Sequence, residues 1–111
     1  MKKLYRKRYV YVAVEKAEAV TDANLMKALR NHLEHIFGLT VLHLSRLKLE
    51  KAVDGKKFIL SVNNCFLKEA IAAITFVGRA GEEDFVLNIL GIESTMKKLL
   101  NKVSRMKMVE D

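Results

Sequence analysis

Two hydrophobic periodicities, one of two residues and one of roughly 3.6, follow each other along this chain in a definite order. Residues 8–15, RYVYVAVE, alternate strictly, with three valines on one face and two tyrosines and an alanine on the other. Residues 22–37 instead carry apolar side chains at helical spacing, between a capping Thr21 and a terminal Gly38. The chain is therefore predicted to begin with a strand that covers a core and a helix that follows it.

The same patterns divide the rest of the chain. We predict a strand at 42–51, a strand at 56–63, a helix that begins at Asn63 or Asn64 and ends before Gly78, a strand at 83–90 and a helix at 95–108. The Asp54-Gly55 pair between the second and third strands is a hairpin signal. The resulting order, β-α-β-β-α-β with an additional C-terminal helix, is the ferredoxin-like or RRM-like α+β arrangement, with an antiparallel sheet. A chain of 111 residues is expected to form a single domain over 1–111.

Positive charge is concentrated at the two ends of the chain, whose formal net charge is +7. Residues 1–8 carry five bases and no acid, and residues 97–111 carry five bases and two acids, whereas the stretch between them has ten bases and eleven acids. We therefore predict a basic N-terminal arm at 1–8 and a basic amphipathic helix at 94–108. Such a distribution favours nucleic acid as a partner, although terminal lysines can also serve only to keep a surface solvated.

The composition excludes several classes of protein. Half of the residues are apolar and proline is absent, which is typical of a folded chain rather than a disordered one. The single cysteine, Cys65, excludes an intramolecular disulfide framework and suits a reducing compartment. The apolar run at 9–14 is too short for a signal peptide, and no stretch approaches the roughly 18 apolar residues of a membrane span. We expect a soluble, cytoplasmic protein that does not contact a membrane.

The sequence contains no recognisable catalytic or metal-binding constellation. His32 and His35 are one helical turn apart but have no further ligands nearby, and Cys65 has no histidine at a catalytic spacing. The predicted loop at 15–20, EKAEAV, lacks the glycine or arginine that would hold an anion, which disfavours a small-molecule regulatory domain or an acylphosphatase on this fold. We therefore expect no catalytic residues, metal site or cofactor in the protein itself.

The segment 88–100, NILGIESTMKKLL, is the best candidate for an anion site. Gly91 permits a tight exit from the preceding strand, and Ser94 or Thr95 can cap the helix that follows. The first amides of such a helix carry partial positive charge and favour a phosphate. Glu93 would repel a nearby phosphate, however, and an ordinary strand-to-helix turn also explains the capping residues.

The last helix is predicted to have two distinct faces. Its apolar stripe consists of Met96, Leu99, Leu100, Val103 and Met106, and its opposite face consists of Lys97, Lys98, Asn101, Lys102 and Arg105. The polar face carries four bases and no acid, whereas ordinary solvated helix faces mix charges of both signs. This difference favours contact with nucleic acid on the basic face.

Aromatic side chains offer an alternative mode of RNA binding. Tyr9 and Tyr11 share the face of the first strand opposite the valines, where proteins of the RRM type stack bases. They are equally suited to lie beneath the C-terminal helix. A free-standing single-stranded RNA-binding protein that uses these two tyrosines therefore stays open as an alternative, whereas Phe58 falls in register with aliphatic core positions.

Three stretches together resemble a known family. The basic start that leads into RYVYVAVE, the helix segment AIAAITFVGRAG at 70–81 and the strand-turn-helix NILGIESTMKKL at 88–99 appear in the same order in that family. They are similar to the small protein of archaeal and eukaryotic ribonuclease P, known as ribonuclease P protein component 2. The resemblance covers nearly the whole chain, and its third stretch is the most specific part.

The resemblance implies a non-catalytic subunit of ribonuclease P. In that family the RNA subunit, with magnesium ions, matures the 5′ end of precursor tRNA, and the protein braces the RNA. The implied partners are the ribonuclease P RNA and protein component 3, in a two-plus-two assembly, and precursor tRNA only through the holoenzyme. Magnesium is expected in the holoenzyme rather than on this protein.

The resemblance also bears on individual residues. Gly91, Thr95 and Lys97 match the family signature, whereas Ser94 stands where many members have glycine, which puts close approach of the backbone to RNA in doubt. Taken with the charged ends, these matches predict RNA contacts at Arg6, Lys7, Arg8, Gly91, Ser94, Thr95, Lys97, Lys98, Lys102 and Arg105.

Overall fold

The computed structural model describes residues 6–17, 20–78 and 83–110, with side chains as far as residue 105. Its elements are β1 (Lys7–Glu15), α1 (Asp22–Phe37), α2 (Leu39–Ser45), β2 (Lys48–Asp54), β3 (Lys57–Asn63), a 3-10 turn (Asn64–Phe66), α3 (Leu67–Phe76), β4 (Val86–Glu93) and α4 (Met96–Glu110). No helix in these described ranges has the length and apolar character needed to cross a membrane.

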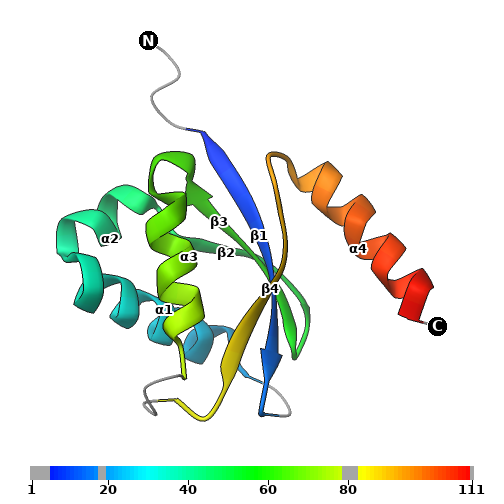
Figure 1. The fold of residues 1–111 in the computed structure, drawn as a ribbon, viewed down its shortest axis with the longest axis horizontal. Coiled ribbons are helices and arrows are strands. Elements are labelled where there is room, and N and C mark those ends of the chain that lie inside the picture. The colour runs from blue at the N-terminus through cyan, green and yellow to red at the C-terminus, as the bar shows by residue number, and fades with distance from the viewer. Residues whose placement is uncertain (1–5, 18–19, 79–82, 111) are drawn as a thin grey trace.

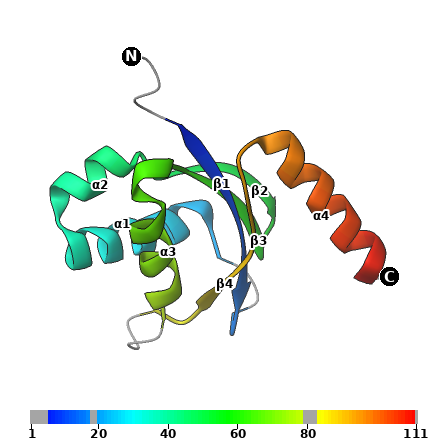
Figure 2. The ribbon, with the colours of Figure 1, turned by 45° about the horizontal axis from the view of Figure 1, so that its top comes forward.

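The strands form one antiparallel sheet in the order β2-β3-β1-β4, with β1 and β3 in the centre. Figures 1 and 2 show α1, α2 and α3 on one side of this sheet and α4 on the other side. The predicted α+β class, ferredoxin-like with an additional C-terminal helix, is confirmed.

The main core lies between the sheet and the helices α1 and α3. The side chains that form it come from alternate positions of the central strands and from one stripe of each helix: Val10, Val12, Val14, Phe58, Leu60, Val62, Leu25, Leu29, Leu33, Ala70, Ala73 and Ile74. The two-residue and 3.6-residue periodicities therefore meet at this interface, as the sequence predicts. Small alanines on α3 allow that helix to lie close to the sheet.

The strand predicted at 42–51 is wrong in its first part, because residues 39–45 form α2 and β2 begins only at Lys48. Gly38, with a φ of +98°, separates α1 from α2, and its carbonyl accepts a hydrogen bond from the Leu42 amide at 3.1 Å. Val41 and Leu42 then pack against the core, and the buried Ser45 follows them at the helical spacings of four and three residues. The alternation that suggested a strand is genuine only from Leu47 onward, and short apolar runs do not separate the two periods.

The strand predicted at 83–90 is displaced by three residues, since β4 comprises Val86–Glu93. Tyr11 pairs with Gly91 and Val12 pairs with Ile89, so that Leu90 is an extra residue in β4. This β-bulge lets β4 change its side-chain alternation halfway along and continue as far as Glu93. Gly91 therefore lies within the strand and not at its exit, contrary to the prediction.

A second, smaller core lies between the sheet and α4. It consists of Tyr11, Ile59, Leu99 and Val103, with Tyr9, Val53 and Met96 packed around it. Of the two alternatives for the tyrosines, the structure shows the place beneath the C-terminal helix: Tyr11, only 1% exposed, packs with Leu99 and Val103, and the partly buried Tyr9 packs against this cluster. The predicted apolar stripe of this helix is narrower than expected: Leu100 is 37% exposed, and the side chain of residue 106 lies outside the described part.

Truncation of the main core should reduce stability strongly. We expect Leu29→Ala to lower the free energy of unfolding by about 2–5 kcal/mol, because it removes a side chain with no exposed surface and leaves a cavity. The matched control is Leu39→Ala, the same chemical change at a side chain that is 54% exposed, which should cost well under about 1 kcal/mol. Urea titration measures both values, and equal losses would contradict this placement of the core.

Candidate nucleic-acid interface

Basic residues from the N-terminal part of the chain line one hollow together with the residues at the start of the last helix. This hollow has a volume of about 320 Å³ and is lined by Arg6, Lys7, Arg8, Tyr9, Ser94, Thr95 and Met96. The sheet brings them together, because β1 and β4 are antiparallel neighbours and Tyr9 pairs with Glu93. The first residues of β1 therefore lie beside the turn that leads from β4 into α4.

Thr95 is the residue that caps α4. Its Oγ1 accepts a hydrogen bond from the Lys98 amide at 3.2 Å, and its carbonyl accepts one from the Leu99 amide at 3.2 Å. Ser94 is exposed immediately before the cap. Of the two capping candidates in the sequence, Thr95 therefore makes the N-cap contact, and the positive end of the helix dipole lies at the first hollow.

A second hollow adjoins the first along α4. It has a volume of about 180 Å³ and is lined by Glu93, Lys98, Asn101, Lys102 and Arg105. Glu93 comes directly before Ser94, which lines the first hollow, and the charge of Arg8 from that hollow acts on Glu93. The residues that line the two hollows are together named here the basic surface. Lys97 is exposed on α4 but lines neither hollow.

Glu93 is the acid within the second hollow. Its Oε2 lies 2.8 Å from Nζ of Lys102, in an ion pair between β4 and α4. The hydrogen bond from Lys102 lowers the pKa of Glu93, and the positive charges of Lys102, Lys98 and Arg8 lower it further. Glu93 therefore remains ionised among bases from both β1 and α4, and its charge is balanced by Lys102.

The bases at the start of β1 are held by side chains of β2 and of the 3-10 turn. Nζ of Lys7 lies 3.3 Å from Oε2 of Glu50, which also accepts a hydrogen bond from Oγ of Ser61 at 2.7 Å. Nε of Arg8 donates to Oδ1 of Asn64 at 2.9 Å. Of the arm predicted at 1–8, these two bases belong to β1, Arg6 is exposed just before it, and residues 1–5 lie outside the described part.

Gly91 lies within β4 and faces Lys102 and Leu99 of α4, whereas the sequence predicts it at the exit from the strand. A Cβ atom added to Gly91 would lie 3.1 Å from Cδ of Lys102 and 3.9 Å from Cδ1 of Leu99. The absence of a side chain at Gly91 therefore leaves room for α4 to pack against β4. The sequence did not reveal this role, nor the Glu93–Lys102 pair, because both depend on how α4 lies across the sheet.

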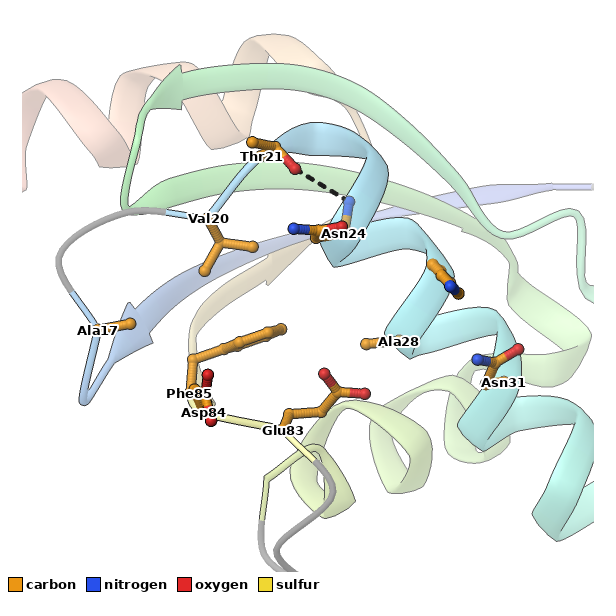
Figure 3. A pocket seen from close by; sticks show the side chains of 10 residues that line it. Ala17, Val20, Thr21, Asn24, Ala28, Asn31, Glu83, Asp84 and Phe85 are labelled. Atoms are coloured by element: carbon orange, nitrogen blue, oxygen red, sulfur yellow. Dashed lines mark hydrogen bonds between the residues drawn. The ribbon is translucent and has the colours of Figure 1, made fainter.

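Another hollow of the described structure has a different character. It has a volume of about 450 Å³ and lies between α1 and residues 83–85, at the opposite end of β1 from the basic surface. Figure 3 shows the carboxylates of Glu83 and Asp84 beside Phe85, opposite Asn24 and Asn31 of α1. Lys27 of α1 also lines this hollow, so its charged lining is two carboxylates and one base. The net charge of this lining is negative and does not favour phosphate.

The histidines do not come together in a metal site. His32 and His35 both lie on α1, where the first is half-buried and the second is exposed. Within the described residues, no group of three or more histidine, cysteine, aspartate or glutamate side chains is placed to hold a metal ion.

Comparison with known proteins agrees with the family suggested by the sequence. The model of the Rpp14/Pop5 family matches residues 8–104. A chain in the cryo-EM structure of yeast ribonuclease MRP is similar in fold, with a TM-score of 0.64 at 15% identity, over 99% of this chain and 97% of that chain. No curated protein sequence matches significantly. The predicted membership in a family of small ribonuclease P proteins is thereby confirmed.

Loss of the cap should weaken α4. We expect Thr95→Ala to cost about 1 kcal/mol, because the Lys98 amide loses its partner. Ser94→Ala is the matched control, and it should leave stability nearly unchanged. Thermal unfolding and amide exchange in the first turn of α4 measure the effect, and an equal loss in both variants would contradict the assignment of the cap.

Lowering the pH should remove the contribution of ionised Glu50 to the stability of the fold. The hydrogen bond from Ser61, with further effects of Lys7, holds the pKa of Glu50 below its ordinary value of 4.5. Ionised Glu50 therefore stabilises the fold above about pH 4.5, and this contribution disappears as the pH falls through the lower pKa of the folded state. The stability difference between the wild type and Glu50→Gln should accordingly shrink on acidification, as urea titrations at several pH values can show. A stability difference between the two proteins that grows toward low pH would contradict this role of Glu50.

Proposed function

The chain belongs to the Rpp14/Pop5 family, and from this premise we propose that it is a non-catalytic protein subunit of ribonuclease P. In this proposal it binds and stabilises the catalytic RNA that matures the 5′ end of precursor tRNA. The supporting observation is the basic surface, in which bases from the start of β1 and from α4 lie together. A surface of this kind suits the phosphates of an RNA backbone.

The proposed contribution of the protein is electrostatic. Phosphates repel one another where RNA helices converge, and bases held on a folded surface offset that repulsion. Binding of this kind releases counterions from the RNA, so affinity falls as salt rises. The protein should therefore lower the concentration of magnesium that the RNA needs, while magnesium and the cleavage chemistry belong to the RNA.

Protein partners form part of the same proposal. We infer that the chain assembles with protein component 3, in a two-plus-two complex, and meets precursor tRNA through the holoenzyme. Large apolar side chains that remain exposed around the junction of α1 and α2, namely Ile36, Phe37, Leu39 and Leu44, support a further protein contact. The yeast chain of similar fold comes from a ribonuclease MRP structure, which is consistent with such an assembly.

Two alternative functions receive less support. A free-standing single-stranded RNA-binding protein would stack bases on Tyr9 and Tyr11, but α4 covers Tyr11 and leaves only 1% of it exposed. A small-molecule regulatory domain would need an anion-binding loop after β1. The described part of that loop contributes Ala17 and Val20 to the hollow that contains the carboxylates of Glu83 and Asp84.

Reconstitution tests the proposed function directly. The full chain, combined with component 3, should raise cleavage of precursor tRNA by the cognate ribonuclease P RNA at limiting magnesium, because added bases replace part of the required cation. The readout is the magnesium concentration for half-maximal cleavage. An unchanged magnesium requirement would overturn the proposal.

A pair of substitutions tests whether α4 contributes to binding. We expect Lys98→Ala combined with Arg105→Ala to weaken RNA binding and to reduce the slope of log affinity against log salt by about 2, since each phosphate that is no longer neutralised lowers the slope by roughly 1. The matched control is Lys27→Ala with Arg30→Ala, which removes the same two charges from exposed positions on α1. Equal effects of the two pairs would show that only net charge matters.

A further inference from the structure

We propose that Gly91, Glu93 and Lys102 form a clamp that sets the position of α4, so that bases from β1 and α4 face the RNA together. This inference rests on the proposed RNA binding and assigns to Lys102 a positioning role in place of the direct contact that the sequence predicts. The three residues are named here the α4 clamp.

The need for a clamp follows from how α4 leaves the sheet. Among its described side chains, which end at residue 105, Leu99 and Val103 are buried against the sheet, and Met96 is half-buried beside them. Figures 1 and 2 show that the C-terminal end of α4 extends away from the sheet. A helix that lies on the sheet at one end and leaves it at the other can change its angle unless a directional interaction fixes it.

Gly91 provides the space for that interaction. A Cβ atom at this position would lie 3.1 Å from Cδ and 3.6 Å from Nζ of Lys102, so the lysine side chain passes directly over the Gly91 backbone. Gly38 and Gly78 have positive φ angles, whereas the φ angle of Gly91 lies outside the left-handed region. The glycine is therefore used here for space and not for its backbone conformation.

Glu93 provides the directional contact. Its carboxylate lies 2.8 Å from Nζ of Lys102, and it is also close enough to Lys98 and Arg8 for their charges to act on it. It therefore stands among bases from two elements and offsets part of their mutual repulsion. The ion pair joins β4 to α4 next to Ser94, which lines the first hollow.

The two possible roles of Glu93 make opposite predictions. If net charge alone governs RNA binding, removing this acid increases the positive potential and strengthens binding. If Glu93 positions α4, removing it weakens binding, because fewer bases then reach the RNA backbone at once. The sign of the change therefore separates the two roles.

The first experiment compares Glu93→Gln with the wild type, using the full chain and the cognate ribonuclease P RNA. We expect a loss of affinity of about fivefold at most, as befits a partly exposed ion pair, and a smaller salt slope. Glu34→Gln is the matched control, because it removes one negative charge from an exposed position on α1, and it should bind equally well or slightly more tightly. Lys102→Arg should retain binding, since an arginine can keep the contact, whereas Lys102→Gln should not.

The second experiment changes no charge at all. Gly91→Ala should displace Lys102 while leaving stability unchanged or raised, because alanine suits a strand at least as well as glycine. We expect weaker RNA binding and faster amide exchange in α4, with an unchanged or higher melting temperature. A purely structural effect of the methyl group would instead lower the melting temperature and affinity together.

The outcomes separate this inference from the proposed function. Tighter binding by Glu93→Gln, together with wild-type binding by Gly91→Ala, would overturn the clamp while leaving RNA binding intact. If the wild type itself shows no salt-dependent RNA binding, the proposed function fails. The clamp is then judged by amide exchange alone: faster exchange of α4 in Gly91→Ala supports it, and unchanged exchange overturns it.

Discussion

The pairing of β1 on both of its edges, together with the burial of both of its faces, is the constraint on which the other elements depend. Its valines pack against α1 and α3, while Tyr11 packs beneath α4. Antiparallel neighbours on either side then fix the directions of β3 and β4. Because successive side chains of a strand point to opposite faces, a shift of β1 by one residue would expose both cores at once. The strict alternation of residues 8–15 therefore determines where the helical layers lie.

The position of the basic surface follows from the same pairing. The N-terminal bases are separated from those of α4 by about ninety residues of near-neutral sequence, yet β1 and β4 are neighbours that run in opposite directions. The start of one strand therefore lies beside the end of the other, and this brings Arg6, Lys7 and Arg8 close to the start of α4. The hollow between α1 and residues 83–85, whose lining includes Glu83, Asp84 and Lys27, lies at the other end of β1.

Local patterns predicted the parts of this structure that depend on neighbours in sequence. The helix at 22–37, the alternation of β1 and β3, and a cap at Ser94 or Thr95 each involve contacts within a few residues. The features that could not be predicted depend on distant contacts. α2 forms because Val41 and Leu42 reach the core, the bulge at Leu90 arises from pairing with β1, and the clamp residues meet only when α4 lies across β4. Burial of Tyr11 could be stated only as one of two alternatives, because α4 decides it.

Several bases of the basic surface already have a partner in the folded protein. Lys7 contacts Glu50, Arg8 contacts Asn64, and Lys102 contacts Glu93. Such contacts compete with phosphate, but they also order long side chains before binding, and ordering one such side chain costs about 0.5–1.5 kcal/mol. With Lys102 and Glu93 exposed by 39% and 25%, their pair is screened by water and is worth about that ordering energy or less. An acid within a basic surface then acts mainly on the positions of the bases, and lowers their attraction for RNA only slightly.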